Sequence, residues 1–140
     1  MITMIRRIFE ALLESAGLRQ GVYPTSADGV AALAVTLTKN AVAWTWGVWA
    51  QIVAATGAET QIVGFTLENF VGALTQGEVG IGFGAAPNEV ELGRFPIVAA
   101  MYTLPKPIKV EAGVRLVARY RNANAVADTV DIKLITLTGF

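Results

Sequence analysis

The sequence predicts an all-β fold, an antiparallel jelly-roll-like β-sandwich of about eight strands with one N-terminal α-helix. Three observations favour this fold class. After residue 29 the hydrophobic residues recur at every second position in short runs, as strands with one buried face require. Turns rich in Gly, Pro or Asn separate these runs at spacings of about 8–15 residues, which is typical of sandwiches and barrels. No helical pattern lies between the runs, so the connections are too short for a parallel sheet.

The one helical pattern covers residues 2–18. Its apolar residues recur at steps of three and four, with Arg and Glu residues between them. Thr3 is a candidate N-cap, and Gly17 is placed to end the helix. Two arrangements stay open: the helix packs on its own domain, or it contacts another subunit or a capsid protein. In the second arrangement the contacting residues are Ile5, Ile8, Phe9 and Leu12.

The chain divides into three segments on this pattern. Residues 1–20 form the helical arm, residues 21–29 form a turn-rich linker, and residues 30–140 form the sandwich domain. Strands are predicted at residues 30–38, 45–55, 60–70, 78–86, 88–102, 106–110, 114–122 and 128–140. A chain of 140 residues is close to the commonest size of a single domain, so one sandwich accounts for its length.

The glycine-rich run GEVGIGFGAAPNEVELG raises the question of a phosphate-binding loop. Such a loop needs its glycines at a strand-to-helix turn, but here another strand follows. The alternation instead gives the strand a bulky face and a bare face: Val79, Ile81 and Phe83 point to the core, and Gly80, Gly82 and Gly84 point outward. A bare face permits close approach by a neighbour, or a bulge and bend in the strand. We therefore expect the three glycines to lie at a contact between subunits.

The chain contains no histidine and no cysteine. Without histidine no Ser-His-Asp triad assembles, and the usual general base and metal ligand are missing. Without cysteine there is no disulfide and no thiolate metal site. Glu89 and Glu91 are two positions apart on a predicted strand and are expected on a solvated face. We therefore expect a protein that is not an enzyme, with no catalytic residue, no cofactor and no metal.

Charge is divided along the sequence. Residues 40–93 contain no Lys or Arg, whereas basic residues dominate from Arg94 onward. The 11 basic and 11 acidic residues cancel, and no exposed aromatic residues are expected between the arginines, so we expect no nucleic-acid partner. Arg115, Arg119 and Arg121 lie on one side of a predicted strand. They are expected to contact an acidic partner, such as residues 40–93 of another copy; scattered surface charge is the alternative.

The uncharged run at residues 40–58 is about long enough to span a bilayer. Polar residues interrupt it, and its three Trp lie in the middle rather than at the ends. A buried strand is therefore the better interpretation, and we expect no membrane partner. In a strand Trp44 and Trp46 would share a face and could form a stacking platform for a sugar, although such rings more often lie in a core or an interface. A carbohydrate-binding module is therefore an alternative function.

The C-terminal half resembles a pattern found in small structural proteins of tailed bacteriophages. In that pattern a strand leads to a P-x-P-I-x-V-x-A-G-x-R-L/I-A-x-R segment, a small polar turn and then A-D-T-V-x-V-x-L. The matching residues here are Pro105, Pro107, Ile108, Val110, Ala112, Gly113, Arg115, Leu116, Arg119, Ala127, Asp128, Thr129, Val130, Ile132 and Leu134. The run AWTWGVWAQIVAATGAETQIVGF is similar to the first half of these proteins. The resemblance covers residues 41–137, and the helix at 2–18 has no counterpart in it.

This resemblance implies a fold, a setting and a partner. Such proteins are typically jelly-roll sandwiches in homotrimers that decorate capsids or form parts of head fibres and tails. The implied function is that of a non-enzymatic virion protein, a homotrimer on the capsid surface that binds the major capsid protein or another virion protein. A tail, neck or fibre component with the same fold is the alternative. The composition agrees, because a chain that is 54% hydrophobic and 16% charged has apolar surface to bury against other subunits.

Overall fold

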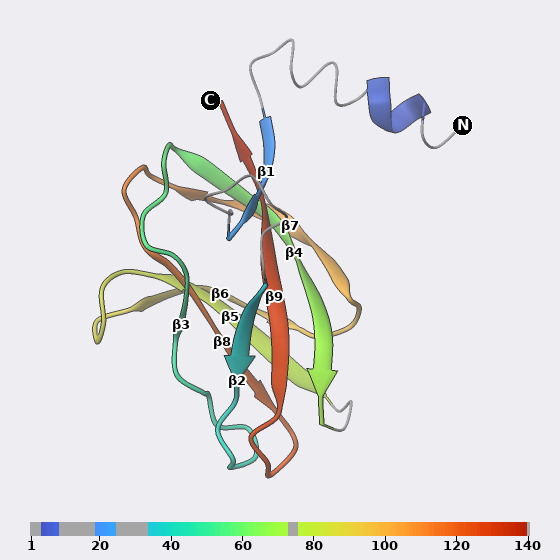
Figure 1. Ribbon diagram of the computed structural model, residues 1–140, viewed down its shortest axis with the longest axis vertical. Coiled ribbons are helices and arrows are strands. Elements are labelled where there is room, and N and C mark those ends of the chain that lie inside the picture. Colours follow the sequence, from blue (N-terminus) through green and yellow to red (C-terminus); the bar gives the residue numbers. More distant parts are fainter. Residues whose placement is uncertain (1–3, 9–18, 25–33, 73–75, 140) are drawn as a thin grey trace.

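The computed structural model describes residues 4–8, 19–24, 34–72 and 76–139, and its strands form two antiparallel sheets packed as a sandwich (Figure 1). The described residues contain nine strands: β1 (Arg19–Tyr23), β2 (Val35–Thr38), β3 (Ala50–Val53), β4 (Thr60–Val71), β5 (Gly77–Phe83), β6 (Val90–Pro96), β7 (Met101–Val110), β8 (Leu116–Asn122) and β9 (Thr129–Thr138). One sheet has the order β1-β9-β4-β7, with β2 also paired to β9, and the other has the order β3-β8-β5-β6. The predicted antiparallel sandwich is confirmed.

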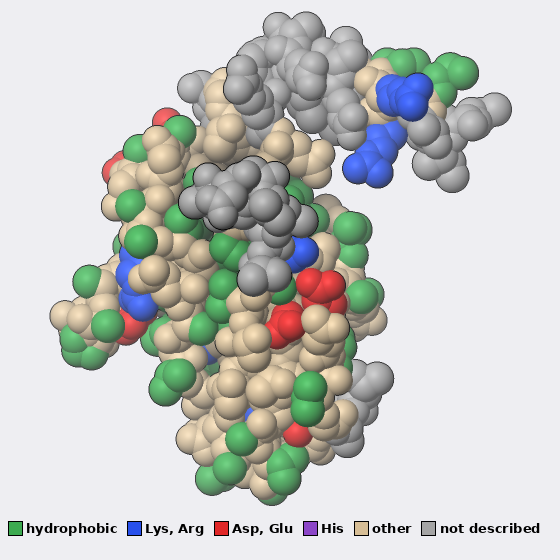
Figure 2. Space-filling view, viewed as in Figure 1, with side chains coloured by type: hydrophobic (Ala, Val, Ile, Leu, Met, Phe, Trp, Pro, Cys, Tyr) green, Lys and Arg blue, Asp and Glu red, His purple; other side chains and the backbone are tan. Residues whose placement is uncertain are grey.

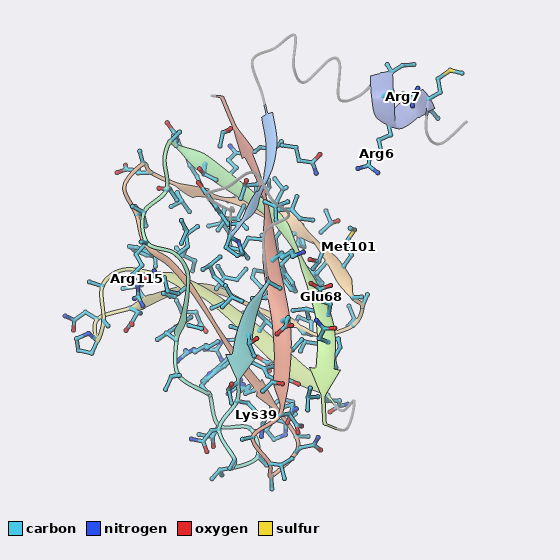
Figure 3. The ribbon with its side chains drawn as sticks, viewed as in Figure 1. Arg6, Arg7, Lys39, Glu68, Met101 and Arg115 are labelled. Atoms are coloured by element: carbon cyan, nitrogen blue, oxygen red, sulfur yellow. The ribbon has the colours of Figure 1, made fainter. Side chains whose placement is uncertain are left out.

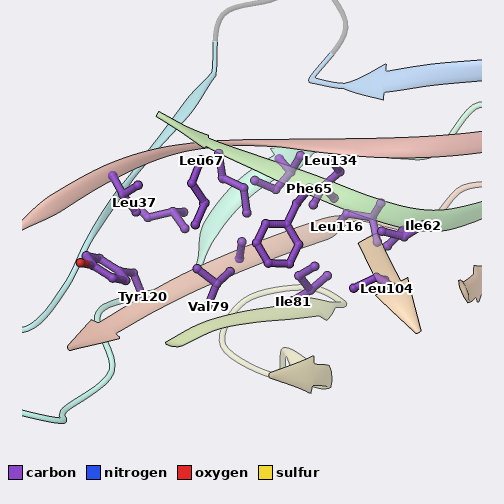
Figure 4. Packing of buried hydrophobic residues seen from close by; sticks show 14 of the residues in the cluster. Leu37, Ile62, Phe65, Leu67, Val79, Ile81, Leu104, Leu116, Tyr120 and Leu134 are labelled. Carbon is purple, nitrogen blue, oxygen red and sulfur yellow. The ribbon is translucent and has the colours of Figure 1, made fainter. Parts of the chain in front are cut away.

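The alternation of side chains predicts the core well. Val130, Ile132 and Leu134 of β9 are completely buried, as are Val79 and Ile81 of β5. Figure 4 shows these inward faces meeting between the two sheets. A ring cluster lies at the centre of the contact: the ring of Phe65 stacks on that of Tyr102 at 5.2 Å and lies 5.8 Å from the ring of Phe95.

Two predicted strands differ from the structure. The run expected at 45–55 is a strand only at β3, because the chain before it bends: Trp44 has a φ of 55°, and at Gly47 a Cβ would overlap the carbonyl oxygen of Thr38. The run expected at 88–102 is split into β6 and the start of β7, and β7 then continues to Val110. Strand β7 belongs to the other sheet, so the connection at residues 97–100 crosses from one sheet to the other.

Strand β1 lies where the sequence predicts the end of the arm and the start of the linker. It pairs with the last part of β9, from Arg19 opposite Thr138 to Tyr23 opposite Leu134. Residues 21–23 therefore belong to the sandwich, because β9 offers them an open edge beyond the end of β2. The number of strands rises from the expected eight to nine for this reason.

The short N-terminal helix is described at residues 4–8, and Figure 1 shows it beyond the end of the sandwich at which β1 begins. The rest of the predicted helix at 2–18, including Thr3, Phe9, Leu12 and Gly17, lies outside the described residues. Met4, Ile5 and Ile8 are each more than half exposed. Within the described residues, no helix has the length and hydrophobicity needed to cross a membrane.

Candidate functional site

The outer face of the β3-β8-β5-β6 sheet carries alternating tryptophan and arginine side chains. We call Trp44, Trp46, Trp49, Arg119 and Arg121 the tryptophan–arginine layer. The guanidinium carbon of Arg119 lies 4.1 Å from the ring centroid of Trp49 and 4.5 Å from that of Trp46. The guanidinium carbon of Arg121 lies 4.4 Å from the Trp46 ring and 5.8 Å from the Trp44 ring. Cations this close to aromatic faces are attracted by about 0.5–2 kcal/mol each, so the layer stabilises the sheet.

The backbone explains why these side chains meet. Strand β8 alternates, so that Ala118 and Tyr120 point into the core while Arg119 and Arg121 point outward. The loop before β3 runs along β8, because the Trp44 amide donates to the carbonyl of Asn122 and the Gly47 amide donates to the carbonyl of Tyr120. The loop thereby holds its rings over the outward side chains of β8.

The glycine face of β5 is covered by this layer and is not bare. Gly80 lies opposite Arg119 in the sheet, and a Cβ on Gly80 would stand 3.3 Å from Cγ of that arginine. A Cβ on Gly82 would stand 2.9 Å from the ring of Trp49. Gly80 and Gly82 are buried within a single chain. The expectation that Gly80 and Gly82 contact a neighbouring subunit is therefore corrected. The large side chains of the same chain fill the space beside these two glycines. Gly84 has a φ of 110° and belongs to the turn after β5.

Arg115, directly before β8, and Arg119 and Arg121 of β8 have their acidic partners in the same chain. The expectation of an acidic surface on another copy is corrected, since each arginine forms an ion pair within the sandwich: Arg115 with Glu89 at 3.2 Å, Arg119 with Glu91 at 3.4 Å, and Arg121 with Glu78 at 3.2 Å. The side chain of Glu89 is only 8% exposed, so its expected solvated position is also wrong. The partners come from β5, β6 and the turn between them, which the sheet order places beside β8.

The sequence predicts that Trp44 and Trp46 share a strand face on which a sugar could stack, but the structure has no strand at these two residues. Both residues lie in the loop before β3, and the guanidinium groups of Arg119 and Arg121 lie over the Trp46 ring. Stacking on a sugar needs an open ring face. The ring of Trp46 is used within the chain, and Trp44 alone is 42% exposed, so this geometry disfavours the carbohydrate-binding alternative.

At the lower end of the sandwich (Figures 1 and 2), hydrophobic side chains lie among backbone and uncharged polar atoms with only small patches of charged atoms, and no charged residue described there is classed as exposed. We call this end of the sandwich the uncharged end. It is made by the loops at 39–49 and 123–128 with the adjacent ends of β4 and β5, and the two loops are joined where the Lys39 amide donates to the carbonyl of Asp128. Its exposed hydrophobic residues include Val42, Trp44, Val71 and Val126, which are 61%, 42%, 63% and 56% exposed.

The two charged residues of the uncharged end point inward. Lys39 is 2% exposed, and its ammonium donates to the carbonyl oxygens of Asn40, Asn124 and Val126 at 2.6, 2.5 and 2.8 Å. Figure 3 shows Lys39 between the two loops. An ammonium has three protons, and all three are used. This lysine therefore ties together backbone segments more than 80 positions apart in the sequence.

Asp128 organises the other side of the same loop. Its carboxylate accepts hydrogen bonds from the side-chain amides of Asn122 at 3.0 Å and Asn124 at 2.7 Å. These bonds from Asn124 and Asn122, with the nearby charge of Lys39, hold the pKa of Asp128 below its usual value. Asn122 is completely buried and also donates to the Tyr120 hydroxyl at 2.8 Å. Burial raises the pKa of that tyrosine. The exposed valines are thus presented on a fixed framework.

The uncharged end was missed by reasoning from the sequence. Its signal was the absence of charge in two segments that become loops, residues 40–50 and 123–127, because loops are normally polar. Within the described residues, no three His, Cys, Asp or Glu side chains come together as a metal site would require.

No known protein-family model matches this chain, and no curated protein sequence is similar to it.

Proposed function

We propose that this protein is a non-enzymatic structural protein of a tailed-bacteriophage virion, a homotrimer that decorates the capsid and stabilises it. The observation that carries the proposal is the uncharged end, which exposes Val42, Trp44, Val71 and Val126 without a charged side chain between them. The centre of a protein–protein interface is apolar, rich in aromatic residues and depleted of charge. We therefore assign the contact with the capsid to this end.

The construction of the uncharged end supports a permanent contact. Lys39, Asn122 and Asp128 hold its loops by buried hydrogen bonds, so the surface loses little conformational entropy when it binds. The resemblance of residues 41–137 to phage structural proteins supports the virion setting. Its matching positions form strands and turns of the sandwich: Pro105 and Pro107 lie in the edge strand β7, and Gly113 has a φ of 78° in the turn before β8.

The first test is the number of copies in a purified particle, measured by quantitative mass spectrometry against the major capsid protein. A capsid decoration protein is expected in hundreds of copies. A handful of copies would assign the protein to a tail, neck or fibre instead, which is the alternative position for the same fold. Absence from the particle would overturn the proposal.

The second test addresses the surface. A protein with both Val42→Asp and Val126→Asp should bind capsids that lack it at least about tenfold more weakly, because two carboxylates would be desolvated in the contact. Val90→Asp is the matched control, since Val90 is 52% exposed but lies on β6 away from the uncharged end. Equal binding by the double variant and the control would exclude the uncharged end as the contact surface.

A further inference from the structure

The described part of the N-terminal helix has an apolar face that is more than half exposed. Met4 and Ile8 are four positions apart and Ile5 and Ile8 are three apart, so the three side chains share one face of a helix. Met4 is 64% exposed, Ile5 is 60% exposed and Ile8 is 54% exposed. Apolar side chains exposed in this way gain free energy when another surface covers them.

The sandwich has an apolar cavity with a volume of about 240 Å³. It opens where β5 and β6 of one sheet face the end of β7 in the other. Its lining residues are Phe83, Leu92, Lys109, Val110, Glu111 and Val114. A cavity of ~150 Å³ already holds a benzene molecule, so this one has room for an aliphatic side chain such as isoleucine.

The register of the sheet places the arm and this cavity at the same end of the molecule. Arg19 of β1 lies opposite Thr138 of β9, Thr138 lies opposite Thr60 of β4, and Thr60 lies opposite Val110 of β7. The arm therefore leaves one edge of the sheet, and the cavity opens at the other edge, about 14 Å away across three strand spacings. A copy that meets another at this end brings its arm to that copy's cavity.

The charges of the two surfaces are complementary. Arg7 is three positions from Met4 and so lies next to the apolar face of the helix. At the cavity, Lys109 is already paired with Glu59, with Nζ 2.7 Å from Oε1, while the exposed carboxylate of Glu111 adds a net negative charge. In a single chain the helix face stays exposed and the cavity stays open, so neither surface satisfies the other within one copy.

We propose that the N-terminal arm of one copy docks on a second copy, with Ile5 and Ile8 at the cavity lined by Phe83, Leu92, Val110 and Val114. This inference rests on the homo-oligomer of the proposed function and names its contact. The arms then hold the copies together at this end, and the uncharged end at the opposite pole stays free for the capsid.

Cysteine cross-linking tests the contact, because the natural chain contains no cysteine. Full-length Ile8→Cys, carrying a mass tag, is mixed with untagged Val114→Cys, and disulfide formation is followed by mass on a non-reducing gel. The matched control replaces Val114→Cys by Val126→Cys, which lies at the uncharged end and is the more exposed of the two positions. Random collisions therefore favour the control. The arm contact predicts a tagged–untagged disulfide dimer at least about fivefold more abundant with Val114→Cys.

Each other outcome contradicts the inference in a distinguishable way. A double variant, Ile8→Cys with Val114→Cys in one chain, that closes its disulfide within the monomer would show that the arm docks on its own copy. An oligomer by light scattering with cross-linking no higher than the control would overturn the arm contact and leave the proposed assembly standing. A chain that stays monomeric by light scattering would overturn both the arm contact and the homotrimer.

Discussion

The two ends of the sandwich place charge in opposite ways. At the uncharged end, Lys39 and Asp128 point into the molecule, and valines and a tryptophan face the solvent. At the other end, formed by the turns at 54–59, 84–89 and 111–115, charged residues face the solvent and apolar side chains line a cavity. We call this second end the charged end. Its ion pair between Glu59 and Lys109 is exposed, with side chains 41% and 67% exposed.

This difference separates the contacts that stabilise the fold from the surfaces that are available for binding. A buried ammonium with three carbonyl partners fixes backbone, whereas an exposed ion pair contributes little to folding because water screens it. An exposed apolar end gains free energy by contact with another protein. The uncharged end is therefore the one that we propose to bind the capsid, and the charged end is the one that we propose to receive the arm of another copy.

The largest expected effect comes from removing the charge that the uncharged end buries. Lys39→Met should lower the free energy of unfolding by at least about 3 kcal/mol, because three carbonyl oxygens lose a charged donor that is itself buried. Denaturant unfolding measures the change. The control is Lys109→Met at the charged end, which should shift the unfolding midpoint little. Equal shifts in the two variants would remove the distinction between the ends.

The backbone should also be packed more closely at the uncharged end than at the charged end. A Cβ on Gly47 would overlap the carbonyl oxygen of Thr38, so Gly47→Ala should destabilise the protein by about 2–3 kcal/mol through displacement of the loop. Gly57 lies in a turn of the charged end and has nothing within 4 Å of its added Cβ. Gly57→Ala should therefore leave the thermal midpoint unchanged or raise it slightly. A large loss in Gly57→Ala would mean that the charged end is packed as closely.

The tryptophan–arginine layer connects the two ends, and its central ring should matter more than its outer ring. Trp46→Ala removes the ring that lies against both Arg119 and Arg121, and should cost about 2 kcal/mol of unfolding free energy. Trp44→Ala removes a ring that lies near Arg121 but is not paired with Arg119. It should therefore lower the free energy of unfolding by less. Urea titrations of both variants measure the difference. A greater loss in Trp44→Ala would contradict this arrangement of the layer.

The smallest expected effect is the dependence of stability on pH at the uncharged end. The pKa of Asp128 is lower in the folded chain than its ordinary value of 3.8, so its contribution to stability is fully present well above pH 3.8 and is lost as the pH falls through the folded pKa. Asp128→Asn should be less stable than the natural chain at pH 7, and the gap should narrow below about pH 4. Chemical unfolding at a series of pH values measures the gap. A gap that stays constant down to pH 2 would contradict this role.

Part of the candidate site could be read from the sequence. The alternation at residues 114–122 predicts that Arg115, Arg119 and Arg121 share the outer face, and the structure places them there. Their partners could not be read in this way. Glu89 lies 26 positions from Arg115, and only the sheet order brings the turn after β5 against the start of β8.

The sequence by itself determined which side chains of each strand point inward, because a period of two leaves one apolar face and only one way to bury it. The tertiary structure alone decided what covers the outward glycines of β5 and where the charge of Lys39 goes. A glycine has no side chain and so carries no information about the neighbour that fills its space. A lysine in a sequence is most often solvated. Its burial here depends on two distant loops whose carbonyl groups converge on one ammonium.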